Sequence, residues 1–294
     1  MKVLGHLSLS GASERSVIVH DTPFADYLHH HKELQIALVY KGSGTMVIGN
    51  CVQQFSTGDI YIIGADQPHL FKSADGDPSN LGAIHIYLEY KTAFEGLLSM
   101  PEMEQIKRFL KNSDYGFKVP KRYTDTATQI IRKIKSSSGL DRLLETIQLL
   151  KFLVNVPRWK PLSTGLYNYS FDGTERLNSI YQYTMKHYHE NISLNKIASV
   201  ACMTPHAFCK YFKKHTLKTY LNFLNEYRIA EACKKLLSED YRSVSAVAYA
   251  TGFSNAITFN RVFKKCMSLT PTAYIDRFKT RESEMDIETF SRSA

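Results

Sequence analysis

The residues of this chain that are best suited to chemistry lie on two predicted helices about fifty residues apart. In each helix, two Phe residues spaced i, i+4 mark a buried face, so the opposite face is exposed. In the second helix that face presents Ile257, Asn260, Arg261 and Lys264. Arg suits the O6 and N7 atoms of guanine, Asn suits N6 and N7 of adenine, and an aliphatic group suits the thymine methyl. These side chains therefore predict a helix that reads bases in a DNA groove.

The matching face of the first helix is basic but less suited to reading bases. Lys often contacts phosphates, and Cys offers little hydrogen bonding. A charged helix face taken alone is more often only solvated, but the repetition of the pattern favours a binding role. The side chains assigned to this face are His206, Cys209, Lys210, Lys213 and Lys214, and Lys265 extends the basic surface of the second helix.

The two helices belong to an internal repeat with the pattern of helix-turn-helix units. Each unit has a short helix opened by a serine, Ser193 or Ser243, then a tight turn, then the exposed helix. Thr204-Pro205 predicts where the second helix of the first unit begins, and Ser254 is the expected cap in the second unit. Between the units, residues 219–237 predict one helix of about 30 Å. A spacer of this length would hold two recognition helices about 34 Å apart, one turn of B-DNA.

The amino-terminal half carries a second group of residues with chemical potential, in the pattern His29-x-His31-x3-Gln35, followed downstream by His69. Imidazole nitrogens and an amide oxygen together can hold Zn, Fe, Mn or Ni. The same groups also serve as hydrogen-bond partners of an organic ligand, or of one another. His85 is expected to point into the same pocket or into a satisfied core position. The residues alone leave all of these alternatives open.

Short β-rich segments separated by Gly, Pro and Asp fill the first ninety residues, which predicts a small barrel or sandwich. Turns at 42–44 and 49–50 lie at hairpin distances, and Glu33 is predicted to be a surface charge at a strand end. From about residue 100 the apolar period becomes helical, with two helices joined near 136–139. The expected strands are 35–40, 45–49, 60–64 and 83–90, and the apolar stripe of the last helix is Leu140, Leu143, Leu144, Ile147, Leu150 and Val154.

Two prolines and a Ser/Thr/Gly cluster interrupt both periods at residues 156–165, which indicates a linker. From 172 to 278 the pattern is helix after short turn. We therefore expect a multidomain α+β protein: an amino-terminal β-barrel with following helices and a carboxy-terminal all-α domain with two helix-turn-helix units. The predicted divisions are 1–160 for the first domain, 161–173 for the linker, 174–280 for the helical domain and 281–294 for a mobile tail.

Composition narrows the partners and the compartment. The formal charge of +9 at pH 7 favours a polyanionic partner. The surplus is larger in the helical half, where residues 166–294 hold 18 basic against 12 acidic side chains, while residues 1–165 hold 19 against 16. The five cysteines form no CxxC pair, which supports neither a zinc finger nor a disulfide scaffold. No stretch has the length of a membrane span, so we expect a soluble, cytoplasmic protein without a membrane partner.

The segment 191–278 resembles the DNA-binding domain of the AraC/XylS family of bacterial transcription regulators. Its strongest stretch is GFSNAITFNRVFKKCMSLTPTAYIDRF. Where that family commonly has a glycine after each recognition helix, this chain has Leu217 and Ser268, so we expect these turns to be capped differently. We expect the helix of Arg261 to discriminate more between sequences. The base contacts implied by the resemblance fall on His206, Cys209 and Lys210 and on Ala256, Ile257, Asn260 and Arg261.

The β half, in turn, resembles a cupin barrel. In metal-binding cupins the positions of His29, His31, Gln35 and His69 would be ligands, although a Glu is usual where this chain has Gln35. In regulators of this resemblance the pocket generally binds a small effector without a metal. The prediction is therefore an effector pocket, with no resident cofactor, and a metal at these four residues is the alternative. The pocket residues assigned are His29, His31, Gln35, His69 and His85.

Taken together, these features predict a transcription regulator, an activator, that binds double-stranded DNA and is controlled by a small effector such as a sugar or sugar derivative. RNA polymerase is a further candidate partner. The stripe at 140–154 would serve a homodimer, and packing within one chain explains it equally well. We find no nucleophile with a base, no phosphate-cradling loop and no paired carboxylates with specific spacing. We therefore do not expect an enzyme, and only the metal-binding barrel leaves catalysis open.

Overall fold

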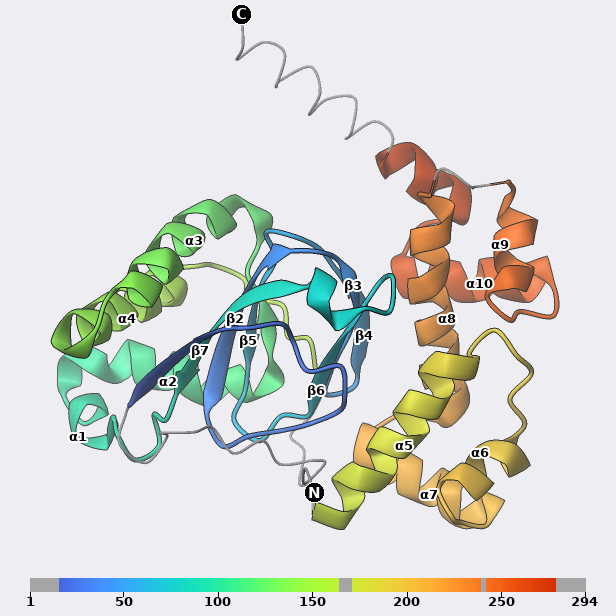
Figure 1. Cartoon of the computed structure of the whole chain (residues 1–294), viewed down its shortest axis with the longest axis horizontal. Helices are drawn as coiled ribbons and strands as arrows, with labels where there is room; N and C mark the ends of the chain where they lie inside the picture. Colours follow the sequence, from blue (N-terminus) through green and yellow to red (C-terminus); the bar gives the residue numbers. More distant parts are fainter. Residues whose placement is uncertain (1–15, 164–170, 239–241, 279–294) are drawn as a thin grey trace, which may run out of the picture.

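The computed structural model describes residues 16–163, 171–238 and 242–278. The predicted tail 281–294 lies outside these ranges. A β-rich half and a helical half lie side by side (Figure 1). In the described residues no helix is long and apolar enough to cross a membrane.

The β half is built from two antiparallel sheets rather than one continuously paired barrel. Inward side chains from both sheets, among them Val39, Met46, Phe55, Tyr61 and Phe71, form one apolar cluster. The first sheet has the order β1-β7-β2-β5-β8 and the second has the order β4-β3-β6. The strands are β1 (Val17–Asp21), β2 (Leu34–Lys41), β3 (Gly44–Ile48), β4 (Cys51–Phe55), β5 (Ile60–Ile63), β6 (His69–Ser73), β7 (Gly82–Leu88) and β8 (Phe117–Lys118).

The four strands expected from the sequence are confirmed, and the strands β1, β4, β6 and β8 were not expected. The turn at 49–50 joins the paired strands β3 and β4, as predicted for a hairpin. The turn at 42–44 does not make a hairpin, because β2 pairs with β5 and β7 while β3 pairs with β4 and β6. It carries the chain from one sheet to the other. Gly44 is required there, since a Cβ atom would lie 1.9 Å from the Lys72 carbonyl oxygen.

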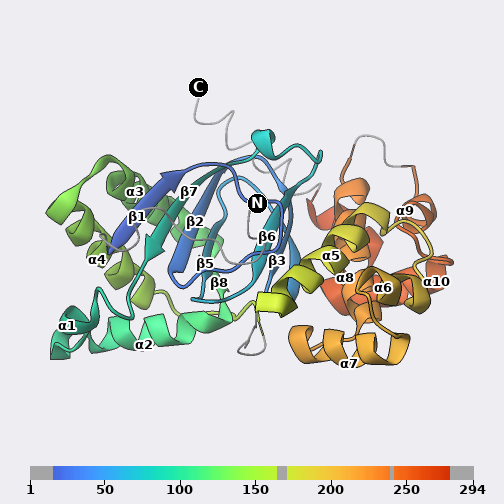
Figure 2. The same cartoon turned by 60° about the horizontal axis from the view of Figure 1, so that its bottom comes forward.

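Helices cover the outer face of the five-stranded sheet (Figure 2). Outward residues of the sheet, such as Ile36 and Ile62, share a core with Ile131 and Leu150 of the two long helices. The prediction of two helices joined near 136–139 is confirmed. Trp159 packs against this core, between Phe109 and Phe117. The helices are α1 (Glu95–Leu98), α2 (Glu104–Asn112), α3 (Lys121–Ser136) and α4 (Gly139–Val154), with short 3₁₀ turns at Pro78–Asn80, Pro101–Met103 and Ser113–Tyr115.

The helical half contains the two predicted helix-turn-helix units. Ser193, Thr204 and Ser243 cap their helices as predicted, each accepting a backbone N–H with its hydroxyl. The cap expected at Ser254 is wrong: Asn255 accepts the N–H of Thr258 at 2.7 Å instead. The helices are α5 (Phe171–His187), α6 (Leu194–Val200), α7 (Pro205–Thr216), α8 (Tyr220–Leu236), α9 (Val244–Ala250) and α10 (Ala256–Met267), followed by helical residues 271–278.

The expectation that α7 and α10 would be capped differently from a glycine-capped helix is also wrong. Leu217 and Ser268 both have φ of 57°, the left-handed conformation that glycine adopts most easily. Each donates its N–H to the last turn, to Lys213 and Lys264 respectively. The chain therefore keeps the backbone geometry and accepts steric strain at a side chain.

The two halves contact one another through the outer face of the three-stranded sheet. Leu28, Val47 and Leu70 of the β half lie in one apolar core with Leu177 and Tyr181 of α5. Further along, strand β4 and helix α8 lie against each other (Figure 1).

Candidate functional site

The second recognition helix, α10, has one buried and one exposed face. Phe259 and Phe263 are fully buried, and Phe263 meets Tyr274 edge-on with ring centroids 5.6 Å apart. On the opposite face Ile257 is 83% exposed, while Asn260 and Arg261 are also exposed. Because the Phe pair fixes the rotation of the helix, these three groups are held outward together. Their chemistry matches base edges and a thymine methyl group.

Helix α7 presents the corresponding face of the first unit. Phe208 and Phe212 are fully buried, so the helix has the same rotation as α10. Lys210 occupies the repeat position of Arg261, and Cys209 that of Asn260. The predicted contacts His206, Cys209, Lys210, Lys213 and Lys214 are all exposed. The chemistry of this face suits phosphates better than bases.

Two of the DNA contacts predicted on α10 lie away from the centre of its exposed face. Ala256 is the first residue of α10 and is half-buried. Lys265 is exposed, unlike its buried neighbour Phe263, and borders a cavity of about 620 Å³ that β4 and α8 also line. Lys264, next to it in the chain, is exposed and does not line this cavity. Lys264 is therefore the better candidate for a phosphate contact.

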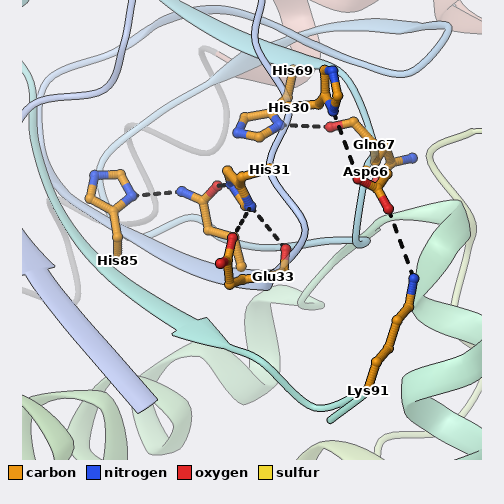
Figure 3. A network of polar contacts seen from close by, with 9 residues as sticks. His30, His31, Glu33, Asp66, Gln67, His69, His85 and Lys91 are labelled. Carbon is orange, nitrogen blue, oxygen red and sulfur yellow. Dashed lines mark hydrogen bonds and ion pairs between the residues drawn. The ribbon is translucent and has the colours of Figure 1, made fainter. Parts of the chain in front are cut away.

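The predicted pocket histidines lie together inside the β half. One ring nitrogen from each of His29, His31 and His69 lies within 4.8 Å of the other two, and all three rings are buried. His29 and His69 are joined by an isolated antiparallel bridge, with ring centroids 4.2 Å apart. Gln35 on β2 contacts both His31 and His85. His31, His69 and His85 are labelled in Figure 3. The structure thus brings together all five residues assigned to the pocket.

Backbone carbonyls set the protonation of the three imidazoles. The Nδ1 atoms of His29, His31 and His69 lie 3.0, 2.9 and 2.8 Å from the carbonyl oxygens of Tyr27, Glu33 and Gln67. A carbonyl only accepts, so each Nδ1 carries the proton and each Nε2 of the neutral ring carries a lone pair. The cluster therefore offers acceptors to whatever lies among its rings.

His31 begins a row of four polar contacts that cannot all be hydrogen bonds between neutral groups. The row runs from the Glu33 carbonyl through His31, Gln35 and His85 to the Thr22 carbonyl, with distances of 2.9, 3.0, 2.7 and 3.0 Å. Both ends are acceptors, two neutral imidazoles supply one proton each, and the amide donates on one side only. In every arrangement one contact places two acceptors face to face. A ligand that displaces Gln35 and donates to His31 Nε2 would remove this conflict.

Burial keeps these rings neutral. It lowers the pKa of His29 to about 3 and the pKa values of His31 and His85 to about 4. Burial also holds the pKa of His69 well below its usual value. The Nε2 atom of His69 is buried without a hydrogen-bond partner among the described residues. Such a group costs about 1–3 kcal/mol unless a ligand satisfies it.

The three Nε2 donors also fit a borderline metal ion such as Zn²⁺, which binds neutral imidazole. Backbone carbonyls orient these rings from behind, as is usual for metal-binding histidines. An ion on His31 Nε2 would replace the contact of that atom with the Gln35 amide oxygen, while His85 still contacts the Gln35 amide nitrogen. The residues that would hold an ion are thus His29, His31 and His69.

Two residues of this region differ from what the sequence indicated. Glu33 is not a surface charge: it is 7% exposed and its carboxylate lies 3.6 Å from His31 Nδ1. Phe24 was missed, although it stacks on Phe71 at 3.9 Å and meets His85 edge-on at 4.8 Å. Neither residue has a repeat or a spacing that would have marked it, since both lie in the irregular segments before β2.

Comparisons with known proteins follow the same division of the chain. Residues 17–153 match the family model of the AraC-like ligand binding domain, and residues 197–277 match that of a helix-turn-helix domain. The uncharacterized HTH-type transcriptional regulator YdeC of Bacillus subtilis (strain 168) is 25% identical over 84% of this chain and 85% of its own length. The HTH-type transcriptional activator RhaS of Enterobacter sp. (strain 638) is 24% identical over 83% of this chain and 85% of its own length. The DNA-binding domain of AdpA, solved with a target DNA, is 25% identical and covers 36% of this chain and 95% of its own, with a TM-score of 0.34.

The two matched segments span the β half and both helix-turn-helix units. The protein is a DNA-binding transcription regulator controlled by a small molecule that binds its amino-terminal domain. The chain belongs to the AraC family.

Proposed function

We propose that this regulator recognises its DNA site chiefly through α10, with α7 adding affinity that depends little on sequence. The exposed triad of Ile257, Asn260 and Arg261 supports this assignment, because all three groups match base edges. The phosphate contacts proposed beside them are the lysines of the two helices. With the regulatory domain at 1–160 and the DNA-binding domain at 174–280, one chain would bind an asymmetric site in the cytoplasm.

Selection of duplexes from a random pool with the full-length protein tests this proposal. We expect each bound chain to cover two conserved stretches about 10 base pairs apart, the stretch under α10 being the more strongly conserved. Binding should weaken steeply with salt. Equal conservation in both stretches, or selection only under α7, would contradict the division of roles.

We further propose that the effector binds among His29, His31, Gln35, His69 and His85. The lone pairs of the imidazoles favour a ligand that brings hydrogen-bond donors, such as the hydroxyl groups of a sugar or sugar derivative. A thermal-shift screen of sugars and divalent metals, with and without chelator, tests this. A ligand at 100 times its Kd adds about 2.7 kcal/mol to stability. A stabilising ligand whose effect survives His69→Ala would place the site elsewhere.

A homodimer is proposed through α4. Leu140 and Leu144 are 69% and 55% exposed on this helix, while Leu149, Leu150 and Leu153 of the same helix are buried within the chain. Light scattering of the wild type and of the double variant Leu140→Glu, Leu144→Glu tests this. The wild type should be dimeric and the variant monomeric, whereas a monomeric wild type would refute the proposal.

We propose that the regulator activates transcription by contacting RNA polymerase, because the relatives RhaS and RhaR are named activators. Transcription in vitro from the selected site tests whether the regulator activates or represses. Activation should require the effector, and repression under the same conditions would overturn it.

A further inference from the structure

The segment 22–29, the first part of the connection from β1 to β2, lies against both the histidine pocket and α5, and it shares an apolar core with the first helix-turn-helix unit. On the pocket side Phe24 is buried against Phe71 and His85. The Thr22 carbonyl accepts from His85 at 3.0 Å. At the other end His29 and His69 exchange backbone hydrogen bonds of 3.1 and 2.9 Å. Both ends of the segment are thus held by residues of the pocket.

The other side of the segment lies against α5. Leu28 is 1% exposed and belongs to the apolar core that contains Phe208 and Phe212 of α7. Its N–H donates to Asn178 Oδ1 at 3.0 Å, and Gln182 donates to the Asp26 carbonyl at 2.8 Å. Leu28 directly precedes His29, so a shift of this histidine moves a side chain in the core of the first unit.

The second unit has no such contact among the described residues. Its core consists of residues from α8 onward, such as Ile229, Phe259 and Phe263, and includes no residue of the β half. The β half meets α8 elsewhere, where Gln54 donates to the Ala230 carbonyl at 2.7 Å. Thr45 of β3 also donates to Glu231 at 2.6 Å. These contacts come from β3 and β4 and not from the segment beside the pocket.

We propose that the segment 22–29 transmits the state of the histidine pocket to the first helix-turn-helix unit and not to the second, with Leu28 as the positioning residue. The proposal rests on the assignment of this pocket as the effector site. Occupancy of the pocket acts on the imidazoles of His29, His31 and His69, and the segment carries the change to α5 and α7. The effector thereby tunes the affinity contributed by the first unit while the second keeps reading its bases.

Hydrogen exchange of the full-length protein, followed by mass spectrometry, tests the link without knowing the effector. His85→Leu removes the contacts with Gln35 and Thr22 inside the pocket. We expect about tenfold faster exchange in α5 to α7 and unchanged exchange in α9 and α10. The same His85→Leu change in a Leu28→Ala background should have no further effect on α5 to α7, and Leu28→Met should restore the response. Gln54→Leu, which removes a contact between β4 and α8, is the matched control and should leave the response intact.

A response of both units, or of neither, would overturn the link, as would full transmission in the Leu28→Ala protein. The effector assignment is tested separately by adding Zn²⁺ or neutral sugars to the wild type and to His69→Ala. If none of these probes alters exchange in the pocket while His85→Leu still reaches α5 to α7, the pocket assignment fails for these ligands and the link stands.

Discussion

The two helix-turn-helix units have nearly the same backbone and very different surroundings. Both turns contain the same hydrogen bond, from Met203 to the Ala198 carbonyl at 2.9 Å and from Phe253 to the Ala248 carbonyl at 3.0 Å. The first unit completes its core with residues of the β half, including Leu28, whereas the second builds its core from its own helices. Repetition of the fold therefore does not imply repetition of the role.

The exposed faces of α7 and α10 also differ between the two units. The second unit places Arg261 where the first has Lys210, and Asn260 where the first has Cys209. An Arg forms paired hydrogen bonds with guanine that a Lys cannot match. The unit whose core is shared with the regulatory domain thus has the less selective surface, and the self-contained unit has the more selective one.

The sharpest way to break this comparison is to remove one matched core residue from each unit. Phe212→Ala and Phe263→Ala both delete a fully buried ring and should each cost about 3–5 kcal/mol. Phe212 shares its core with the β half, so its loss should also destabilise that half. Trp159, the only tryptophan, packs in the β half and reports on it by fluorescence during urea unfolding.

We expect the Trp159 transition to move to lower urea in Phe212→Ala and to stay in place in Phe263→Ala, while far-ultraviolet circular dichroism shows a loss of stability in both. A shift of the tryptophan signal of equal size in both variants would mean that the second unit is coupled to the β half as strongly as the first.

Arg261→Ala and Lys210→Ala compare the two surfaces directly. Loss of Arg261 should cost about 1–3 kcal/mol of DNA affinity and relax the preference at one base position. Loss of Lys210 should weaken all sequences by a similar factor, as should loss of Lys214, and reduce the salt slope by about 1. Fluorescence anisotropy with the selected site and with single-base variants measures both. An unchanged base preference in Arg261→Ala would show that α10 does not read that position.

Acid acts on the β half through its buried histidines. The pKa values of His29, His31 and His85 are lowered by burial to between about 3 and 4, so the folded state keeps these rings neutral while the unfolded chain protonates them below about pH 6.5. The free energy of unfolding therefore keeps its full value above pH 6.5. It falls as the pH drops towards 4, by up to about 1.4 kcal/mol per pH unit for each ring.

The Trp159 urea midpoint, followed from pH 7.5 to 4.5, measures this loss. His85→Leu should flatten the slope, because it removes one of the rings whose pKa is lowered by burial. A slope that is the same in the wild type and in His85→Leu would contradict the buried neutral state of this ring.

The sequence was informative where one pattern repeats along a regular element. The Phe pairs fixed which faces of α7 and α10 are exposed, and the apolar period located α3 and α4. It was less informative where side chains meet through irregular chain. Glu33 and Phe24 lie in such segments, and their burial depends on how the two sheets close, which no local spacing records.

The same reasoning explains the errors at turns. The glycines at 42–44 resemble a hairpin in sequence, but whether two strands pair is decided by the other strands available to them. Ser254 and Asn255 are both good caps, so only the geometry chooses between them. Gathering His29, His31 and His69 was predicted through the cupin resemblance, whereas the carbonyls that set their protonation come from the folded backbone.

The smallest expected effect concerns the left-handed caps that the two units share. Leu217→Gly and Ser268→Gly relieve the strain of a φ of 57°. The greater freedom of glycine in the unfolded chain offsets part of this gain, so each change should stabilise its unit by at most about 0.5–1 kcal/mol. Leu217 is 47% exposed and gives up some apolar contact, whereas Ser268 is exposed and gives up little. Ser268→Gly should therefore raise the thermal midpoint more, measured by circular dichroism. If Leu217→Gly stabilised the chain more, the strain at Leu217 would exceed that at Ser268 despite their equal φ, which would mean that contact with the β half constrains the first cap.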